Sequence, residues 1–175
     1  LADMYKNGYF VEKNYEEYKR IIKELYPKVK KATYLFDPLP EVFTRLASIK
    51  AEEGDEDQAI QLYLRAREFL AVNPFFGNLN IMKWLIEDLY KIIYPEADDI
   101  NFYDLYYYLS SPIIICLRYA NDYYTVAAVE EDEEIHIKFE DKWYISVDDF
   151  FKKASIGDKL LTELYLEIDD IQIKG

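Results

Sequence analysis

Hydrophobic positions in the first 110 residues recur three and four places apart, which is the spacing of one face of an α-helix. This pattern predicts helices over about 15–26, 40–54, 55–72, 79–94 and 100–109. Prolines and glycines such as Pro27, Gly54, Pro74 and Pro95 separate these segments and mark their ends. Short turns between successive helices predict helical hairpins.

The period changes after Ser111. Two runs rich in β-branched and aromatic residues, IIICLRY and YYTVAAV, flank Ala120, Asn121 and Asp122 and predict a β-hairpin. Ile135, Ile137 and Phe139 alternate with polar residues and predict a third strand, and WYIS predicts a fourth.

The last thirty residues mix short helices with a strand. Ser146 stands three residues before Asp149 and resembles the cap of a short helix. The sequence from Gly157 through Tyr165 predicts a further helix, and IDDIQI predicts a final strand. We therefore expect a helical domain over residues 1–110 and a small α+β domain with an antiparallel sheet over residues 111–175.

An internal repeat is visible in the helical part. LADMYKNG at Leu1 and LASIKAEEG at Leu46 align through Leu-Ala and a glycine, and the two copies start 45 residues apart. The second copy resembles the tetratricopeptide repeat, with small and large residues in the order that its two packed helices use: Phe43, Leu46, Ala47, Gly54, Ala59, Tyr63 and Ala66.

The first copy resembles the Sel-one-like repeat, a relative of the tetratricopeptide repeat whose helices are joined by a Gly-x-Gly-Val turn. The matching positions are Leu1, Ala2, Tyr5, Gly8, Val11 and Asn14. Phe10 stands where that family has its second glycine, and Tyr18 where it has a small alanine. The chain thus resembles the later half of one repeat joined to the next, which predicts further repeats upstream of Leu1.

The resemblance implies a mostly α fold, a helical solenoid that presents a concave surface to a protein or peptide. It transfers no catalytic residue, because the family pattern is structural. We therefore predict a non-enzymatic scaffold or protein-interaction module, with the α+β domain closing the solenoid.

Charge limits the partners. The chain has 34 acidic and 21 basic residues, a net charge of −13, so it repels nucleic acid and anionic membranes overall. Seven basic and fifteen acidic residues give 111–175 a charge of −8. This acidity suits a basic protein, and the alternative hypothesis is an immunity or inhibitor protein that binds a basic toxin or nuclease.

Site chemistry is sparse in the sequence. The only cysteine and the only histidine, Cys116 and His136, are a weak candidate for a catalytic pair, because the alternation places His136 on a polar face and Cys116 in an apolar run. The acidic run 130–134 lacks the glycine turn of a calcium loop, and the glycines are too isolated for a phosphate loop. We predict no catalytic residue, metal or cofactor.

Aromatic residues are the remaining candidates for function. The chain has 18 Tyr and 10 Phe, residue types that suit protein interfaces. A helix cannot bury three consecutive rings on one stripe, so at least one ring of the triple tyrosine should face solvent or the other domain. The predicted partner contacts are Tyr9, Phe10, Tyr106, Tyr107 and Tyr108.

Location follows from the same features. No apolar stretch approaches the ~20 residues of a membrane span, and residues 1–21 are too polar for a signal peptide. We expect a cytoplasmic protein.

Overall fold

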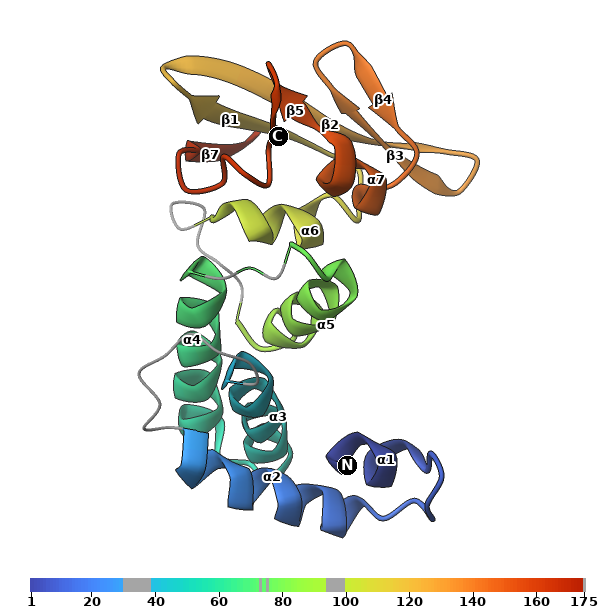
Figure 1. Ribbon diagram of the computed structural model, residues 1–175, viewed down its shortest axis with the longest axis vertical. Coiled ribbons are helices and arrows are strands. Elements are labelled where there is room, and N and C mark those ends of the chain that lie inside the picture. The colour runs from blue at the N-terminus through green and yellow to red at the C-terminus, as the bar shows by residue number, and fades with distance from the viewer. Residues whose placement is uncertain (30–38, 73, 75, 94–99, 175) are drawn as a thin grey trace. The chain divides into compact units, whose positions relative to one another are not determined.

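The computed structural model describes residues 1–29, 39–72, 74, 76–93 and 100–174. The chain separates into two compact units (Figure 1), residues 1–74 with 88–93 and residues 75–87 with 94–175. The first unit contains α1 (Ala2–Asn7), α2 (Tyr15–Val29), α3 (Leu39–Glu52) and α4 (Glu56–Val72). The expected division after residue 110 stays a prediction.

The α3–α4 hairpin forms where the sequence predicts the second repeat copy. Gly54 has a left-handed φ of 80° in the turn, a conformation that glycine adopts at little cost. Ala47, Ala59 and Ala66 are completely buried, so the two helix backbones approach closely with Tyr63 and Leu70 packed around them.

A second, shorter hairpin joins α1 to α2. The side chain of Asn14 caps α2 by accepting a hydrogen bond from the Glu17 amide at 3.0 Å. The Asn14 amide donates to the Tyr5 carbonyl at 2.9 Å, which holds the turn against α1. Tyr18, bulky where the resembled family is small, is only 1% exposed and stacks on Tyr15 with ring centroids 5.3 Å apart.

The second unit is built on an antiparallel sheet. It contains η1 (Phe102–Asp104), α6 (Leu105–Tyr108), α7 (Val147–Lys153) and all but the last two residues of α5 (Leu79–Leu89). The five strands lie in the order β4-β3-β2-β1-β7, and β5 pairs with β6. The strand bounds are β1 Ile113–Tyr119, β2 Asp122–Glu131, β3 Glu134–Phe139, β4 Lys142–Tyr144, β5 Ser155–Ile156, β6 Lys159–Leu160 and β7 Asp169–Lys174.

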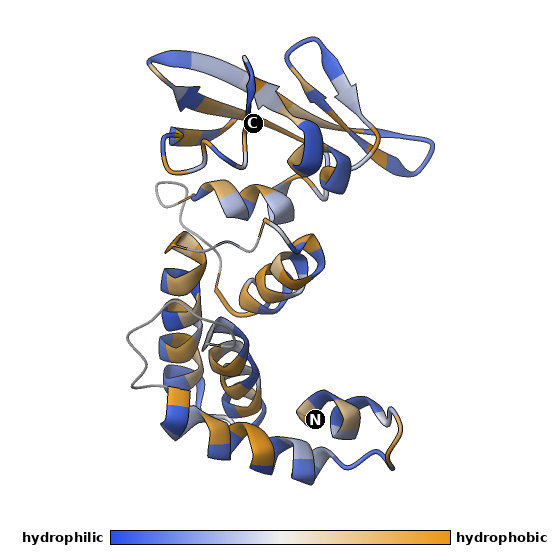
Figure 2. Ribbon diagram, viewed as in Figure 1, coloured by the Kyte–Doolittle hydropathy of each residue, from blue (hydrophilic) through white to orange (hydrophobic). Residues whose placement is uncertain are grey.

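Hydrophobic and polar residues alternate along these strands (Figure 2). The buried face packs against α7, where Phe150 is fully buried and contacts Phe139, Tyr144 and Phe151 with ring centroids 5.9, 5.6 and 5.5 Å away. Figure 1 shows α6 and α7 on the same side of the sheet. No element of the described residues covers the other face.

Several predictions of local structure are confirmed. Ala120 and Asn121 form the β1–β2 turn with φ of 52° and 67°, and Ile137 and Phe139 are buried on one face of β3. The Ser146 hydroxyl accepts a hydrogen bond from the Asp149 amide at 3.1 Å and caps α7.

The predicted mostly α solenoid is wrong. Helices make up 49% of the described residues, and the C-terminal half is rich in strands, so the fold is a mixed α+β fold. The expected third helix pair is reduced to α5 and the short η1 and α6. Two helical hairpins bury too little apolar surface to form the core of the whole chain. The second unit has an aromatic core under a sheet instead of further helical hairpins.

The helix expected from Gly157 is also wrong. Gly157 has a φ of 58° and lies in the tight turn between β5 and β6, because a left-handed residue joins two antiparallel strands more readily than it continues a helix. Leu161 and Leu164, which fit the spacing of one helix face, lie in turns instead, where both are buried.

Candidate functional site

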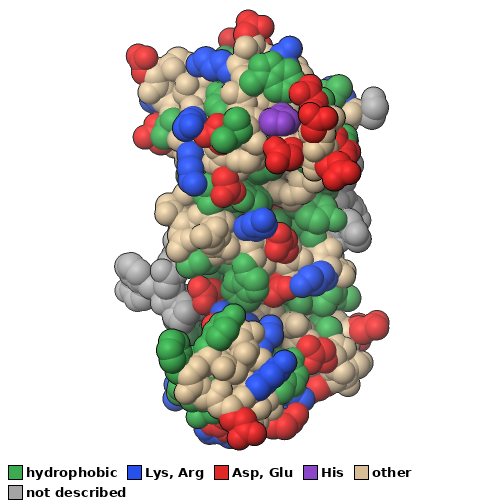
Figure 3. Space-filling model, turned by 90° about the vertical axis from the view of Figure 1, so that its right-hand side faces the viewer, with side chains coloured by type: hydrophobic (Ala, Val, Ile, Leu, Met, Phe, Trp, Pro, Cys, Tyr) green, Lys and Arg blue, Asp and Glu red, His purple; other side chains and the backbone are tan. Residues whose placement is uncertain are grey.

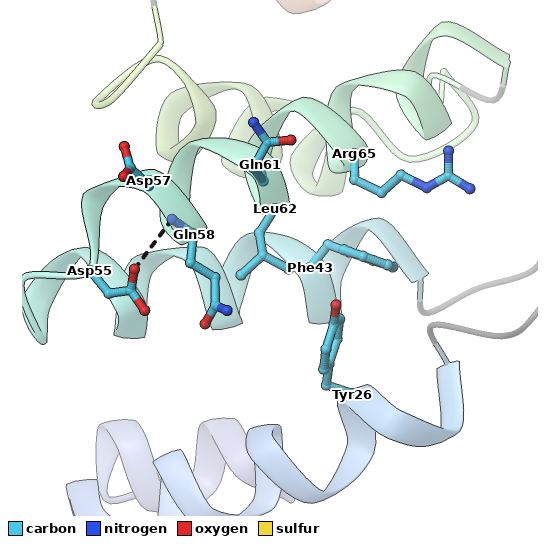
Figure 4. A pocket seen from close by; sticks show the side chains of 8 residues that line it. All are labelled: Tyr26, Phe43, Asp55, Asp57, Gln58, Gln61, Leu62 and Arg65. Carbon is cyan, nitrogen blue, oxygen red and sulfur yellow. Dashed lines mark hydrogen bonds between the residues drawn. The ribbon is translucent and has the colours of Figure 1, made fainter.

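The first unit contains an open groove of about 610 Å³ between α2, α3 and α4 (Figure 4). The side chains that line it are Tyr26, Phe43, Asp55, Asp57, Gln58, Gln61, Leu62 and Arg65. Six of the eight are polar, and they surround an apolar floor formed by Phe43 and Leu62, which are each 5% exposed.

Two polar contacts hold α2 beside the end of α3 and so fix one wall of the groove. The Tyr15 hydroxyl donates to the Glu52 carboxylate, with its oxygen 2.8 and 2.7 Å from the two carboxylate oxygens. The Lys23 ammonium lies 2.6 Å from Oε1 of Glu53. This hydrogen-bonded ion pair lowers the pKa of Glu53 below its usual value.

A line of aromatic rings forms one end of the groove. Tyr26 of α2 meets Phe43 of α3 edge to face at 5.5 Å, and Phe43 contacts Phe69 of α4 at 5.6 Å. The Arg65 guanidinium lies 5.1 Å from the centre of the Phe69 ring and is paired with Glu68. These contacts hold the rings of Tyr26, Phe43 and Phe69 in place against one another.

The other end is acidic. The Asp55 carboxylate accepts a hydrogen bond from the backbone N–H of Gln58 at 3.4 Å at the start of α4, and it lies 3.6 Å from the Lys50 ammonium. Asp57 is exposed and has no ion pair among the described residues. Negative charge here also interacts favourably with the N-terminal end of the helix dipole of α4.

The groove has the groups for binding an extended polypeptide. Figure 4 shows the Gln58 side chain directed from α4 toward α2, while Gln61 is directed away from α2. Each amide can donate to a peptide carbonyl and accept from a peptide N–H at the same time. The eight lining residues include no Ser, Cys, His or Lys.

Sequence reasoning missed this groove. Gln58, Leu62, Arg65 and Phe69 follow one another at intervals of four, three and four residues along α4, which is the spacing of one helix face. That signal was present, but the lining also needs Tyr26 from α2, and only the fold brings these residues together.

Tyr9 and Phe10, two of the predicted partner contacts, lie in the turn between α1 and α2, away from the lining of the groove. They are 62% and 97% exposed. Phe10 has a left-handed φ of 62°. Both rings are therefore accessible on the first unit as described.

The triple tyrosine in α6 divides into two environments. Tyr106 is 5% exposed, its hydroxyl donates to the Asp148 carboxylate, and its ring contacts Phe151 at 5.4 Å. Tyr107 and Tyr108 are half-buried and meet edge to face at 5.5 Å. Tyr106 thus belongs to the core of the second unit, and the other two rings are partly accessible.

The structure places Cys116 and His136 on the same face of the sheet but far apart. Cys116 is opposite Thr125 and His136 is opposite Val129. These two positions of β2 are four residues apart, about 13 Å along the strand at 3.3 Å per residue. Cys116 is half-buried and is not part of a disulfide. This geometry holds no nucleophile–base pair.

Within residues 1–29, 39–72, 74, 76–93 and 100–174, no three His, Cys, Asp or Glu side chains are grouped so that they could hold a metal ion. Among the same residues, no helix has the length and apolar character needed to cross a membrane.

Comparisons with protein-family models, with curated proteins and with solved structures gave no match to this chain.

Proposed function

We propose that the first unit is a non-enzymatic protein-interaction module that binds an extended segment of a partner protein in the groove between α2, α3 and α4. One observation carries this proposal. An apolar floor of Phe43 and Leu62 lies beside the side-chain amide of Gln58, which is directed toward α2 and can pair with a peptide backbone.

The charges of the groove favour one kind of segment. Asp55 and Asp57 would attract a Lys or Arg side chain at one end, and Arg65 would attract a carboxylate at the other, although Glu68 already pairs with Arg65. An apolar side chain between them would lie on the floor. The resemblance of residues 1–74 to Sel-one-like and tetratricopeptide repeats supports a binding role, because those repeats commonly hold peptides against their helices.

A photocrosslinking experiment tests this function. A benzophenone amino acid replaces Gln61 in one variant and Glu12, an exposed residue outside the groove, in a matched control. Each full-length chain is illuminated in a lysate of its source cells, and the crosslinked peptide is identified by mass spectrometry. We expect position 61 to capture a defined segment of one protein that position 12 does not capture.

A second variant tests whether capture of the segment depends on the groove. Adding Gln58→Ala to the position-61 variant should reduce capture of that same segment by about tenfold, since a lost hydrogen bond and its desolvated partner weaken binding by roughly this factor. Equal crosslinking patterns from positions 61 and 12 would contradict the proposal.

A second candidate function is inhibition of a basic toxin or nuclease. The observation that favours it is the turn 130–134, in which five successive acidic residues are all exposed. This function predicts one tight partner whose binding weakens with salt. An interaction that is independent of salt and maps to the helices would exclude it.

A further inference from the structure

A second open groove, of about 670 Å³, lies at one end of the sheet in the second unit. Here β1 begins and β2 and β7 end, because Ile114 is opposite both Ala127 of β2 and Lys174 of β7. Pro112, Val129 and Ile173 also line the groove. Its lining is almost entirely aliphatic.

Two aliphatic side chains at this groove reach water on the same face of the sheet. Ile114 is 48% exposed and Val129 is half-buried. Ile114 is opposite Ala127, two residues before Val129, so these side chains share a face, whereas Ile173 is opposite the buried Ile115 and lies on the other face. Covering such side chains with an apolar group of a partner removes their surface from water and favours binding.

Acidic side chains lie next to the groove. Glu130 lines the groove and begins a run of five acidic residues, Glu130–Glu134, that joins β2 to β3. All five are exposed, and none has an ion pair or a side-chain hydrogen bond within the described part of the chain. Figure 3 shows acidic side chains gathered beside the single histidine of the chain.

The acidic run is held in a defined shape. Glu131 is opposite Glu134, and the two residues between them, Asp132 and Glu133, have φ of 52° and 66°. These angles are those of a tight two-residue hairpin turn, so the carboxylates project from a rigid loop rather than from a disordered tail. Lys174 is the one cationic side chain that lines the groove.

We propose that this groove and the adjacent acidic turn together bind a cationic segment of a protein partner, with an aliphatic side chain placed against Ile114 and Val129 and Lys or Arg side chains facing Glu130–Glu134. A second copy of this chain would bring two acidic turns together and is disfavoured by repulsion. The inference does not depend on the groove of the first unit, which uses different residues.

Fluorescence anisotropy with a defined probe tests the proposal. The probe is a labelled twelve-residue peptide of alternating Lys and Ile, compared with a Lys–Gly peptide and a Glu–Ile peptide of the same length. Full-length protein should bind the Lys–Ile peptide most tightly, and binding should weaken as salt is raised. Equal binding of the Lys–Gly peptide would show that charge alone acts and would overturn the proposal.

Variants locate the binding. Ile114→Ser and, separately, Val129→Thr should each weaken Lys–Ile binding by up to about tenfold, as expected when a buried aliphatic contact is lost. The control is Ile145→Ser, a change at a side chain that is 74% exposed and does not line the groove. An effect of Ile145→Ser as large as those of the other two would contradict the site.

Charge neutralisation separates the turn from the overall charge of the protein. The first variant converts the turn to amides, with Glu130→Gln, Glu131→Gln, Asp132→Asn, Glu133→Gln and Glu134→Gln. The second removes the same charge elsewhere, with Glu12→Gln, Glu56→Gln, Asp141→Asn, Asp158→Asn and Glu167→Gln. Only the first should weaken binding by about tenfold or more and flatten its salt dependence; equal losses in both would overturn the proposal.

Discussion

Gly8 and Phe10 both have left-handed backbone conformations, with φ of 77° and 62°, in the turn between α1 and α2. Glycine adopts this conformation freely, whereas a residue with a Cβ atom pays about 1–2 kcal/mol for it. In the repeat family that this turn resembles, both positions are glycine. Phe10 therefore occupies a position where the backbone favours glycine, while its ring is almost fully exposed.

Replacing Phe10 by glycine should stabilise the first unit. Removal of the left-handed strain is partly offset by the larger conformational entropy of glycine in the unfolded chain, so we expect a gain of up to about 1 kcal/mol, or a few degrees in Tm. Thermal unfolding followed by circular dichroism measures it. Tyr9→Gly is the matched control, because Tyr9 has no left-handed φ and should only lose stability. Equal effects of the two variants would contradict the strain.

The α3–α4 hairpin depends on small residues at its centre. Ala66 is completely buried, so Ala66→Leu inserts three carbon atoms where the helices touch. We expect a destabilisation of about 1–3 kcal/mol, measured by urea unfolding. Gln61→Leu introduces the same leucine side chain on the exposed face of the same helix and should change the free energy of unfolding by less than about 0.5 kcal/mol. A smaller effect at Ala66 than at Gln61 would mean that the packing is loose.

Local patterns were the most predictable part of this fold. The period of three to four residues located α2, α3 and α4, and the strict alternation of Ile135, Ile137 and Phe139 located β3 and its buried face. Ser146 and Ala120–Asn121 identified a helix cap and a hairpin turn, because each of these features is set by neighbouring residues alone.

What failed depended on residues far apart in sequence. The apolar residues Leu161 and Leu164 fit a helix period but are buried from turns, because Gly157 closes the β5–β6 hairpin before a helix can begin. The groove in the first unit was not predicted, since Tyr26 and Phe43 meet only after α2 packs on the α3–α4 hairpin. A repeat motif in residues 1–74 likewise could not determine how much of the remaining chain would be sheet.

Phe150 is the residue on which the core of the second unit most depends. It is fully buried among three aromatic rings of β3, β4 and α7. Phe150→Ala should cost about 3–5 kcal/mol and lower the Tm of this unit by many degrees, because a large cavity replaces the ring. Trp143→Ala removes a larger side chain that is 54% exposed, and it should cost much less. Similar losses in the two variants would argue against an aromatic core centred on α7.

Alkaline pH should unfold the first unit through its buried tyrosines. Burial raises the pKa of Tyr18 to about 12, and it raises the pKa of Tyr63 to about 12 as well. Burial disfavours the charged tyrosinate, so the folded state binds these two protons more strongly than the unfolded state does. Their contribution to stability is fully present below the ordinary tyrosine pKa of 10 and is lost as the pH rises from about 10 to about 12.

Tyrosinate absorbance and far-ultraviolet circular dichroism, recorded together across this pH range, measure the effect. The buried rings should ionise together with the loss of helix signal. Tyr18→Phe keeps the stacked ring against Tyr15 but removes one titrating hydroxyl, so its unfolding should begin at a higher pH. Tyr9→Phe removes a hydroxyl from a side chain that is 62% exposed and should leave the transition unchanged. If the two variants unfold at the same pH, the ionisation of Tyr18 is not linked to folding.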